Sequence, residues 1–360
     1  MVGAREGSES GGAGATRERA VGREDGKRPR DPAARLTLEQ QLGQLLVMSF
    51  DGVKAPEYIL RRLRRGEGSG VILFGKNAPD AASVKALTAT LRRAGANGAL
   101  VATDQEGGSI RSLAFAPPPS SQGASGTPDS AGTSAAAAAR GLREAGLNVN
   151  LAPVADVAQP GSVLSGRAYP GVASAVARLV GVAVRRHDGE RVGATAKHFP
   201  GLGRAGENTD DAPVTIDASR RELEEDLIPF RAAIDAGVPL VMSSHALYPA
   251  LDRRRIASQS PIVLRDLLRR QMGFKGAVVT DSIEARAVIA RSGVAVAAER
   301  AVSAGADLVL MTGSGSWNEV HPHLLRRAQA SPRLRARVGE AAGRVLVLKR
   351  RLGLSVPGGR

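Results

Sequence analysis

Two short polar segments carry side chains that could act on a polyhydroxylated ligand. Lys197 and His198 end the strand-like run 192–198, and a turn rich in Gly and Pro follows them. Asp281 ends a second apolar run further along the chain. A cation beside an imidazole can donate hydrogen bonds to hydroxyl groups, and a carboxylate at the mouth of a strand can attack an anomeric carbon. Together the two segments suggest a site that cleaves sugars.

Each of these residues also has a structural interpretation. Asp281 could cap a helix that begins at Ser282, because Asp is a favoured residue at that position. Lys197 and His198 could instead bridge carboxylates of neighbouring strands. From the residues alone, both interpretations stay open for all three side chains.

Further polar residues follow other predicted strands. Asp104 could accept hydrogen bonds from two adjacent hydroxyls, or it could pair with Lys197 or Arg167. Arg167 lies in an expected loop, where it could hold an acetamido or carboxylate group or be an ordinary surface residue. His245 is interpreted as a core or supporting histidine. Because these groups gather at one end of the strands, a functional site is favoured over scattered surface polarity.

The elements that must position these residues alternate along the chain. Eight short apolar runs are predicted to be strands, and they lack the polar alternation of half-exposed strands, as expected for parallel strands that are covered on both faces. We therefore predict an α/β fold, a (β/α)8 TIM-type barrel, with a doubly wound open sheet as the alternative. The predicted strands are 45–50, 70–74, 99–104, 149–154, 192–198, 240–245, 277–281 and 307–312. The predicted helices include 81–94, 134–145, 175–187, 220–236, 262–271 and 294–304.

The chain divides into one barrel and two short tails. Residues 1–36 are rich in Gly, Ala, Ser, Arg and Glu without apolar periodicity, which predicts a disordered tail. The barrel is expected over 37–354, opened by a capping box with Thr37 and Gln40, and 355–360 form a C-terminal tail. A long irregular segment, 116–132, is expected to overhang the catalytic face or to be a floppy insertion.

Composition limits the classes of protein that fit. The 360 residues include no cysteine, which excludes disulfides and thiolate chemistry, and no apolar run is long enough to span a membrane. The first residues contain no segment typical of a secretory signal, so a cytoplasmic protein is expected. No His, Asp or Glu spacing fits a metal site, and we predict neither metal nor cofactor.

The net charge of +15 is concentrated near the C-terminus, where residues 321–360 hold ten Lys or Arg and one acid. This surplus is interpreted as a solvated helix face, with an anionic partner as the alternative. The region has no aromatic residue to stack on bases, so nucleic-acid binding is not expected.

The ordered motifs resemble the N-terminal barrel domain of glycoside hydrolase family 3, in particular its single-domain bacterial β-N-acetylhexosaminidases. The resemblance spans about 38–354. It implies a retaining β-glycosidase with Asp281 as nucleophile, Asp104, Arg167, Lys197 and His198 as sugar-binding residues, and an amino-sugar glycoside from peptidoglycan or chitin-type fragments as substrate. The motifs that carry it are GQLL (43–46), GVILF (70–74), DQEGG (104–108), APVADV (152–157), KHFPG (197–201), MSSH (242–245) and TDS (280–282).

The chain departs from that family pattern at the general acid/base. The hexosaminidase branch usually reads Lys-His-Phe-Pro-Gly-His-Gly, and a later Asp-Ser-His supplies a catalytic Asp–His dyad. Here Leu202 replaces the second His of the first motif, and if Asp210 aligns with the dyad Asp, Ala212 stands where the catalytic His is expected. Three outcomes follow: Asp210 or Asp211 serves as the acid, only good leaving groups are cleaved, or the barrel binds sugar with weakened catalysis.

Overall fold

The computed structural model describes residues 3, 32–96 and 98–356. Most of the predicted tail 1–36 and the end of the predicted tail 355–360 lie outside these residues. Within the predicted N-terminal tail, η1 (Pro32–Arg35) is a short 3-10 helix, and its Ala33 is fully buried. The described fold thus begins at Pro32, five residues before the predicted start at residue 37.

Eight parallel strands close into a barrel in the order β1-β12-β11-β8-β7-β6-β3-β2. The predicted TIM-type barrel is confirmed and the open-sheet alternative is wrong, because β1 pairs with both β2 and β12. Each strand lies within, or one residue beyond, a predicted run. The bounds are β1 (Leu46–Met48), β2 (Gly70–Ile72), β3 (Leu100–Thr103), β6 (Val149–Asn150), β7 (Gly193–Phe199), β8 (Leu240–Ser243), β11 (Ala277–Ser282) and β12 (Leu308–Leu310).

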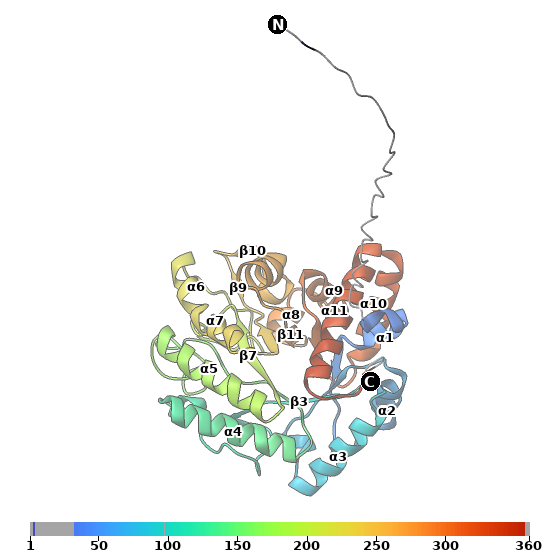
Figure 1. Cartoon of the computed structure of the whole chain (residues 1–360), viewed down its shortest axis with the longest axis horizontal. Coiled ribbons are helices and arrows are strands. Elements are labelled where there is room, and N and C mark those ends of the chain that lie inside the picture. Colours follow the sequence, from blue (N-terminus) through green and yellow to red (C-terminus); the bar gives the residue numbers. More distant parts are fainter. Residues whose placement is uncertain (1–2, 4–31, 97, 357–360) are drawn as a thin grey trace. The chain divides into compact units, whose positions relative to one another are not determined.

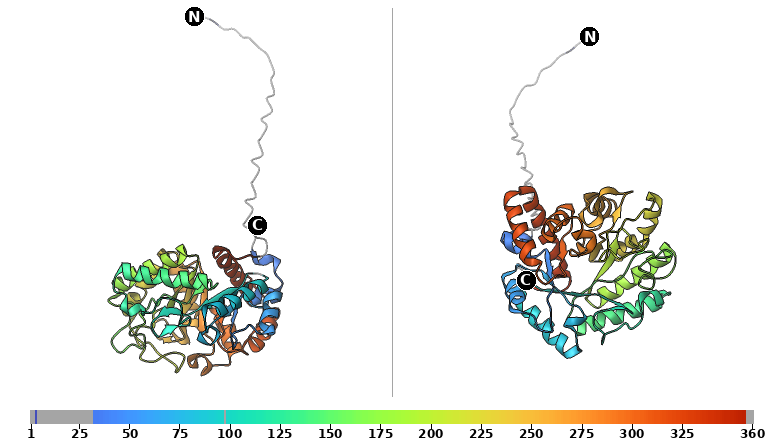
Figure 2. Two further views of the ribbon diagram at one scale, coloured as in Figure 1. Left: turned by 90° about the horizontal axis from the view of Figure 1, so that it is seen from below. Right: turned by 180° about the vertical axis from the view of Figure 1, so that it is seen from behind.

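Helices surround the barrel as a ring (Figure 1). The ring closes where the last helices pack against α1, and Figure 2 shows these C-terminal helices in red beside the blue N-terminal elements. The helix bounds are α1 (Leu38–Gly43), α2 (Glu57–Arg65), α3 (Ala81–Ala94), α4 (Pro128–Glu144), α5 (Ala173–Gly189), α6 (Arg220–Asp226), α7 (Ile228–Asp235), α8 (Arg286–Ile289), α9 (Val294–Ala304), α10 (Trp317–Ala330) and α11 (Pro332–Arg351), with the π-helix η5 (Ile262–Gln271) and the 3-10 turns η2 (Gly75–Asn77), η3 (Gln122–Ala124) and η4 (Ala257–Gln259).

The helix starts and breaks follow local chemistry. The capping box predicted at Thr37 and Gln40 is present at the start of α1. The predicted helix 220–236 is interrupted between α6 and α7, where Pro229 lies at the start of α7 and has no N–H to continue the hydrogen-bond ladder. The helix predicted over 262–271 is present with those bounds, but it is the π-helix η5, which is wound more widely than an α-helix.

The segment 116–132 is more ordered than predicted. It contains η3, and α4 begins inside it at Pro128, where the Thr127 hydroxyl accepts a hydrogen bond from the Ser130 N–H. The Gln122 side chain bonds the backbone of Val154 at both its N–H and its carbonyl. The floppy-insertion interpretation is therefore wrong for this segment.

One helix stripe closes the N-terminal end of the barrel. Val345, Leu348 and Leu352 recur along one face of α11 and beyond its end, and they join the cluster of inward-facing strand residues. Gly193, the first residue of β7, leaves room for Leu352, because a β-carbon there would lie 3.3 Å from the Leu352 side chain. With this end sealed, the open end lies at the C-termini of the strands, where barrel enzymes hold their sites.

Candidate active site

A cavity of about 190 Å³ opens at the C-terminal ends of the strands. All six residues that the sequence singled out as catalytic or sugar-binding line it, although they come from four different strands or the loops after them. Apolar side chains, among them Leu164, Met242 and Leu310, form other parts of its wall. The six residues are Asp104, Arg167, Lys197, His198, Asp210 and Asp281.

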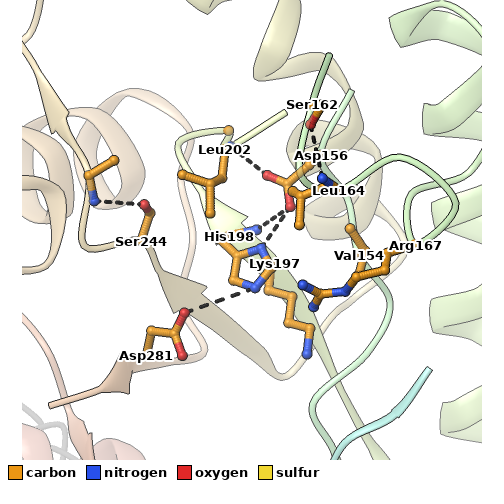
Figure 3. A network of polar contacts seen from close by, with 12 residues as sticks. Val154, Asp156, Ser162, Leu164, Arg167, Lys197, His198, Leu202, Ser244 and Asp281 are labelled. Atoms are coloured by element: carbon orange, nitrogen blue, oxygen red, sulfur yellow. Dashed lines mark hydrogen bonds and ion pairs between the residues drawn. The ribbon is translucent and has the colours of Figure 1, made fainter. Parts of the chain in front are cut away.

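Asp281 faces His198 across this cavity. The Oδ2 atom of Asp281 lies 4.0 Å from Nε2 of His198, and β8 separates the two strands that carry them (Figure 3). Asp281 belongs to β11, and α8 begins only at Arg286, so the helix-cap interpretation of Asp281 is wrong. The side chain keeps 20% of its surface exposed and is thus accessible from the cavity.

The electrostatic surroundings keep Asp281 ionised. Burial by itself would raise the pKa of this carboxyl, because a charged group is poorly solvated there. The imidazoles of His198 and His245 and the N–H of Ser282, 2.8 Å from Oδ1, favour the anion more strongly, and the pKa of Asp281 lies below its ordinary value. A carboxylate in this state is a suitable nucleophile.

Asp156 fixes the orientation of His198. Its fully buried carboxylate accepts hydrogen bonds from Nδ1 of His198 at 2.8 Å, from the His198 N–H at 3.0 Å and from the Leu202 N–H at 2.6 Å. Because a carboxylate oxygen accepts hydrogen bonds, Nδ1 of His198 is the donor in this contact. Nε2 faces Asp281, as Figure 3 shows, and both residues line the cavity.

Glu106 joins Lys197 and Arg167 beneath the cavity. Arg167 donates two hydrogen bonds to its carboxylate, at 3.0 and 2.7 Å, and Nζ of Lys197 lies 2.7 Å from it. Lys197 also donates to Asp104 at 2.6 Å. The predicted alternatives for Asp104 thus coexist, since it both pairs with Lys197 and lines the cavity, and Arg167 is not an ordinary surface residue.

Sequence reasoning did not select Glu106 as a site residue. It is 4% exposed, and although burial would raise its pKa, Lys197 and Arg167 lower the pKa to about 2. The available signal was spacing. Asp104 and Glu106 are two residues apart at the end of β3 and in β4 (Gln105–Gly107), and alternation along an extended chain places such residues on one side.

Asp210 reaches the cavity from the loop after β7. Backbone bonds hold this loop against the segment after β11: the N–H of Arg286 donates to the Asp210 carbonyl and that of Ala287 to the Thr209 carbonyl. Burial and then repulsion by Asp281 raise the pKa of Asp210 to about 6. Asp210 is solvent-exposed at the rim, so water screens part of the repulsion from Asp281.

The family's second histidine position holds an apolar wall residue. The Leu202 side chain lines the cavity, while Ala212 does not, and the Ala212 N–H donates to the Asn208 carbonyl within the loop. His198 is the only histidine among the described residues that line the cavity. His245 is fully buried behind it, with Nδ1 2.7 Å from the Ser258 hydroxyl, as expected of a supporting residue.

The described residues also bear on metal binding and on membrane spans. In residues 32–96 and 98–356, no group of three or more His, Asp or Glu side chains is arranged to hold a metal ion. None of the helices in the same residues combines the length and the apolarity needed to cross a bilayer.

Comparison with known proteins identifies the family. Residues 37–348 match the model of the glycosyl hydrolase family 3 N-terminal domain. A β-hexosaminidase of Xanthomonas campestris pv. campestris is 33% identical over 68% of this chain and 76% of its own length. An uncharacterized secreted glycosyl hydrolase of Arthroderma benhamiae is 35% identical over 78% of this chain and 84% of its own.

Solved structures agree with this assignment. A family 3 β-N-acetylglucosaminidase from Paenibacillus sp. superposes with a TM-score of 0.84 at 35% identity, covering 90% of this chain. This chain spans 64% of the length of that protein, less than two thirds. A β-N-acetylhexosaminidase from Beutenbergia cavernae gives a TM-score of 0.80 at 33% identity, covering 88% of this chain and 99% of its own. The chain therefore belongs to glycoside hydrolase family 3 and is a β-hexosaminidase-like glycosidase.

Proposed function

We propose that the protein is a retaining β-N-acetylhexosaminidase that releases terminal β-linked N-acetylglucosamine from peptidoglycan or chitin-type fragments. The observation that carries this proposal is a pair of carboxyl groups with opposed pKa shifts, Asp281 and Asp210, at one cavity. Two titratable groups whose pKa values are pushed apart fit the roles of nucleophile and general acid.

In the first step the Asp281 carboxylate attacks the anomeric carbon. A bond forms between Oδ of Asp281 and that carbon, and the bond to the leaving oxygen breaks. Asp210 gives its proton to the leaving oxygen, so the aglycone departs as a neutral alcohol and Asp210 becomes a carboxylate. The raised pKa of Asp210 supports this role, since the group must be protonated before the step.

In the second step water hydrolyses the glycosyl ester. Asp210, now ionised, takes a proton from water as the resulting hydroxide attacks the anomeric carbon, and the bond to Asp281 breaks. Two displacements on the same carbon return its original configuration. Asp281 is regenerated as a carboxylate and Asp210 as an acid, so the cycle closes without a cofactor.

The remaining polar side chains would hold the sugar. Lys197 and Asp104 form an ion pair. The remaining N–H groups of Lys197 and lone pairs of Asp104 can bind two neighbouring hydroxyls of the sugar. His198 directs Nε2 towards Asp281. The cavity is smaller than the range of about 300–1,000 Å³ typical of drug-sized ligands. A volume of about 190 Å³ is consistent with one sugar ring and hence with a terminal residue as substrate. The similarity to a β-N-acetylglucosaminidase and a β-N-acetylhexosaminidase favours an N-acetylated sugar.

A second candidate is a sugar-binding barrel with weakened catalysis. It is favoured by Leu202 and Ala212, which stand where the family resemblance expects histidines. In this case Asp210 would not protonate the leaving group, and the loss of a general acid lowers the rate by about 10²–10⁴. Substrates whose leaving group needs little protonation would still react.

Aryl glycosides separate these candidates. We expect wild-type protein to release 4-nitrophenol from 4-nitrophenyl β-N-acetylglucosaminide faster than from the β-glucoside. Asp281→Ala should lower that rate by at least about 10³, as loss of a nucleophile does in other hydrolases. Sugar binding without release from either glycoside would favour the weakened barrel. A fluorosugar inactivator that labels a residue other than Asp281 would remove the proposed nucleophile.

Azide tests Asp210 directly. Asp210→Ala should retain the first step on an activated aryl glycoside but slow the second, because no base then activates water. Azide needs no base, so it should restore turnover and yield a β-glycosyl azide. Asp211→Ala is the matched control and should need no rescue. If rescue occurs with Asp211→Ala instead, the acid/base is the neighbouring residue.

A further inference from the structure

A second and larger cavity lies away from the active site. Its volume is about 910 Å³, and it is bounded by η5, α9 and α11 together with the loop before β12. Gly305 lines the groove from the loop before β12, at the N-terminal end of the barrel, whereas Arg255 and Pro261 line it from the segment between β8 and η5. The two cavities share no lining residue.

This cavity, which we call the arginine groove, is strongly basic. Eight arginines and two glutamates line it, and none of the lining residues is aromatic. It contains several cations of the C-terminal basic region together with arginines from η5 and α9. The arginines are Arg255, Arg265, Arg269, Arg270, Arg300, Arg333, Arg337 and Arg344.

Two carboxylates, those of Asp307 and Glu340, neutralise part of this charge. The buried carboxylate of Asp307 accepts hydrogen bonds from Arg269, from Arg337 at 2.6 Å and from Arg344 at 3.3 Å. Glu340 binds Arg337 and Arg344 as well, at 3.2 and 2.6 Å. These three arginines form the floor of the groove and are held in place by a shared carboxylate.

The rim of the groove carries unneutralised charge. Arg265 on η5, Arg300 on α9 and Arg333 on α11 form no ion pair with any other residue in the described ranges 32–96 and 98–356. Arg265 donates a hydrogen bond to the backbone carbonyl of Ser303. Burial and the repulsion from Arg337 and Arg333 lower the pKa of the Arg265 guanidinium, which shows how closely the cations crowd.

We propose that the arginine groove binds a small ligand that carries at least two phosphoryl groups. Three unpaired guanidinium groups from three helices surround one hollow, and a guanidinium donates two parallel hydrogen bonds to a phosphoryl group. The volume lies in the range typical of small-molecule sites. Without aromatic side chains the groove has no platform for stacking bases, which favours such a ligand over single-stranded nucleic acid.

The proposal is tested on the full chain with inorganic pyrophosphate as probe. Isothermal titration at constant ionic strength should detect one site, with binding at least about tenfold tighter than that of orthophosphate, because a second phosphoryl group adds charge-assisted hydrogen bonds. The triple variant R265Q/R300Q/R333Q should weaken pyrophosphate binding by at least about tenfold. The variant R61Q/R178Q/R220Q removes the same charge from exposed arginines outside the groove and should bind like wild type.

Chemical labelling gives a second readout that needs no variant. Pyrophosphate should protect Arg265, Arg300 and Arg333 from phenylglyoxal, with the modified residues mapped by peptide mass spectrometry. The proposal is overturned if wild type does not bind pyrophosphate, if orthophosphate binds equally well, or if both triple variants lose binding alike. Duplex DNA that binds through these arginines where pyrophosphate does not would overturn it in favour of nucleic acid. None of these measurements depends on glycosidase activity.

Discussion

Arg167 and Glu106 form a bidentate ion pair at the wall of the active site, with Nε and Nη2 of the arginine 3.0 and 2.7 Å from the two carboxylate oxygens. The same carboxylate holds Lys197, which in turn holds Asp104. The ligand-facing cation and carboxylate are therefore both positioned by a glutamate that does not itself line the cavity. Substrate binding should therefore depend on the buried carboxylate of Glu106.

Glu106→Gln should weaken catalysis and stability together. The variant keeps the shape of the side chain, but among the described residues it leaves Arg167 without an ion pair and Lys197 paired with Asp104 alone. Removing one partner of a buried pair costs about 3–5 kcal/mol, and the amide should retain part of this through hydrogen bonds, so we expect a loss of about 2–4 kcal/mol. Urea unfolding measures the loss, and kcat/KM on the aryl glycoside should fall by at least about tenfold.

The matched control is Glu225→Gln on the surface of α6. Glu225 pairs with Arg221 at 3.8 Å, and both side chains are more than half exposed. Surface pairs contribute about 0–1 kcal/mol, so neither unfolding nor kcat/KM should change appreciably. If Glu106→Gln behaved like this control, Glu106 would not organise the site.

The barrel itself could be predicted partly from the resemblance to glycoside hydrolase family 3 and partly because its strands have a recognisable sequence signal. Each is a short run of apolar residues buried on both faces, and pairing with two neighbours leaves little freedom in register. The small antiparallel additions could not be predicted. The hairpins β4 with β5 (Ile110–Arg111) and β9 (Leu247–Tyr248) with β10 (Asp252–Ile256) contain no apolar run longer than two residues, so they lack the signal that marks the barrel strands.

The sequence predicted which residues of the candidate site lie at strand ends. It predicted less well which side chains contact one another. Lys197 and Asp281 lie at the ends of apolar runs, so the sequence locates them at strand ends. Closure of the barrel then brings these strand ends together. The partners of these residues depend on side-chain directions in three dimensions. Neither the Asp156 bond to His198 nor the Glu106 bond to Arg167 has a spacing that sequence could reveal. The early start of α4 was missed because Ala, Ser and Gly give a weak apolar period.

The two cavity carboxyls predict a bell-shaped dependence of kcat/KM on pH. Asp281 must be ionised, so activity falls as the pH drops through its lowered pKa. Asp210 must be protonated, so its contribution is present at low pH and is lost as the pH rises through about 6. Above this pH, kcat/KM should fall strongly for an unactivated disaccharide and only weakly for a 4-nitrophenyl glycoside, because that leaving group needs little protonation. Asp210→Asn should abolish that limb, and its persistence would assign it to another group.

Lys349 predicts a second pH effect, on stability. Its ammonium group is fully buried in α11, its bond to the Gln44 side chain is 2.6 Å long, and burial lowers its pKa to about 7. In the unfolded chain the pKa is about 10.4, so between these values the unfolded state binds more protons. Burial of Lys349 therefore destabilises the fold at pH 7, and this penalty shrinks as the pH rises towards 10.

Lys349→Met removes the penalty and its pH dependence. The stability of the variant relative to wild type should be greatest near pH 7 and should decline by pH 10, as measured by urea unfolding across that range. Loss of the bond to Gln44 changes the difference in unfolding free energy between variant and wild type by a constant amount. It does not change how that difference depends on pH. Lys54→Met, at an exposed position, should show no such slope. A flat difference for Lys349→Met would mean that the lysine stays charged in the folded protein.

Ala212→His tests why this chain lacks the expected histidine. Asp210 is anchored by the Arg286 N–H, and Ala212 lies two residues further in the same turn. An imidazole there could act as the general acid, with Asp210 as its partner. This should raise the turnover of unactivated disaccharides by up to about 10²-fold. Ala212→Asn controls for added size and polarity without a titratable group and should give no gain. If both variants reduce turnover, the loop requires a small residue at this position and Asp210 acts alone.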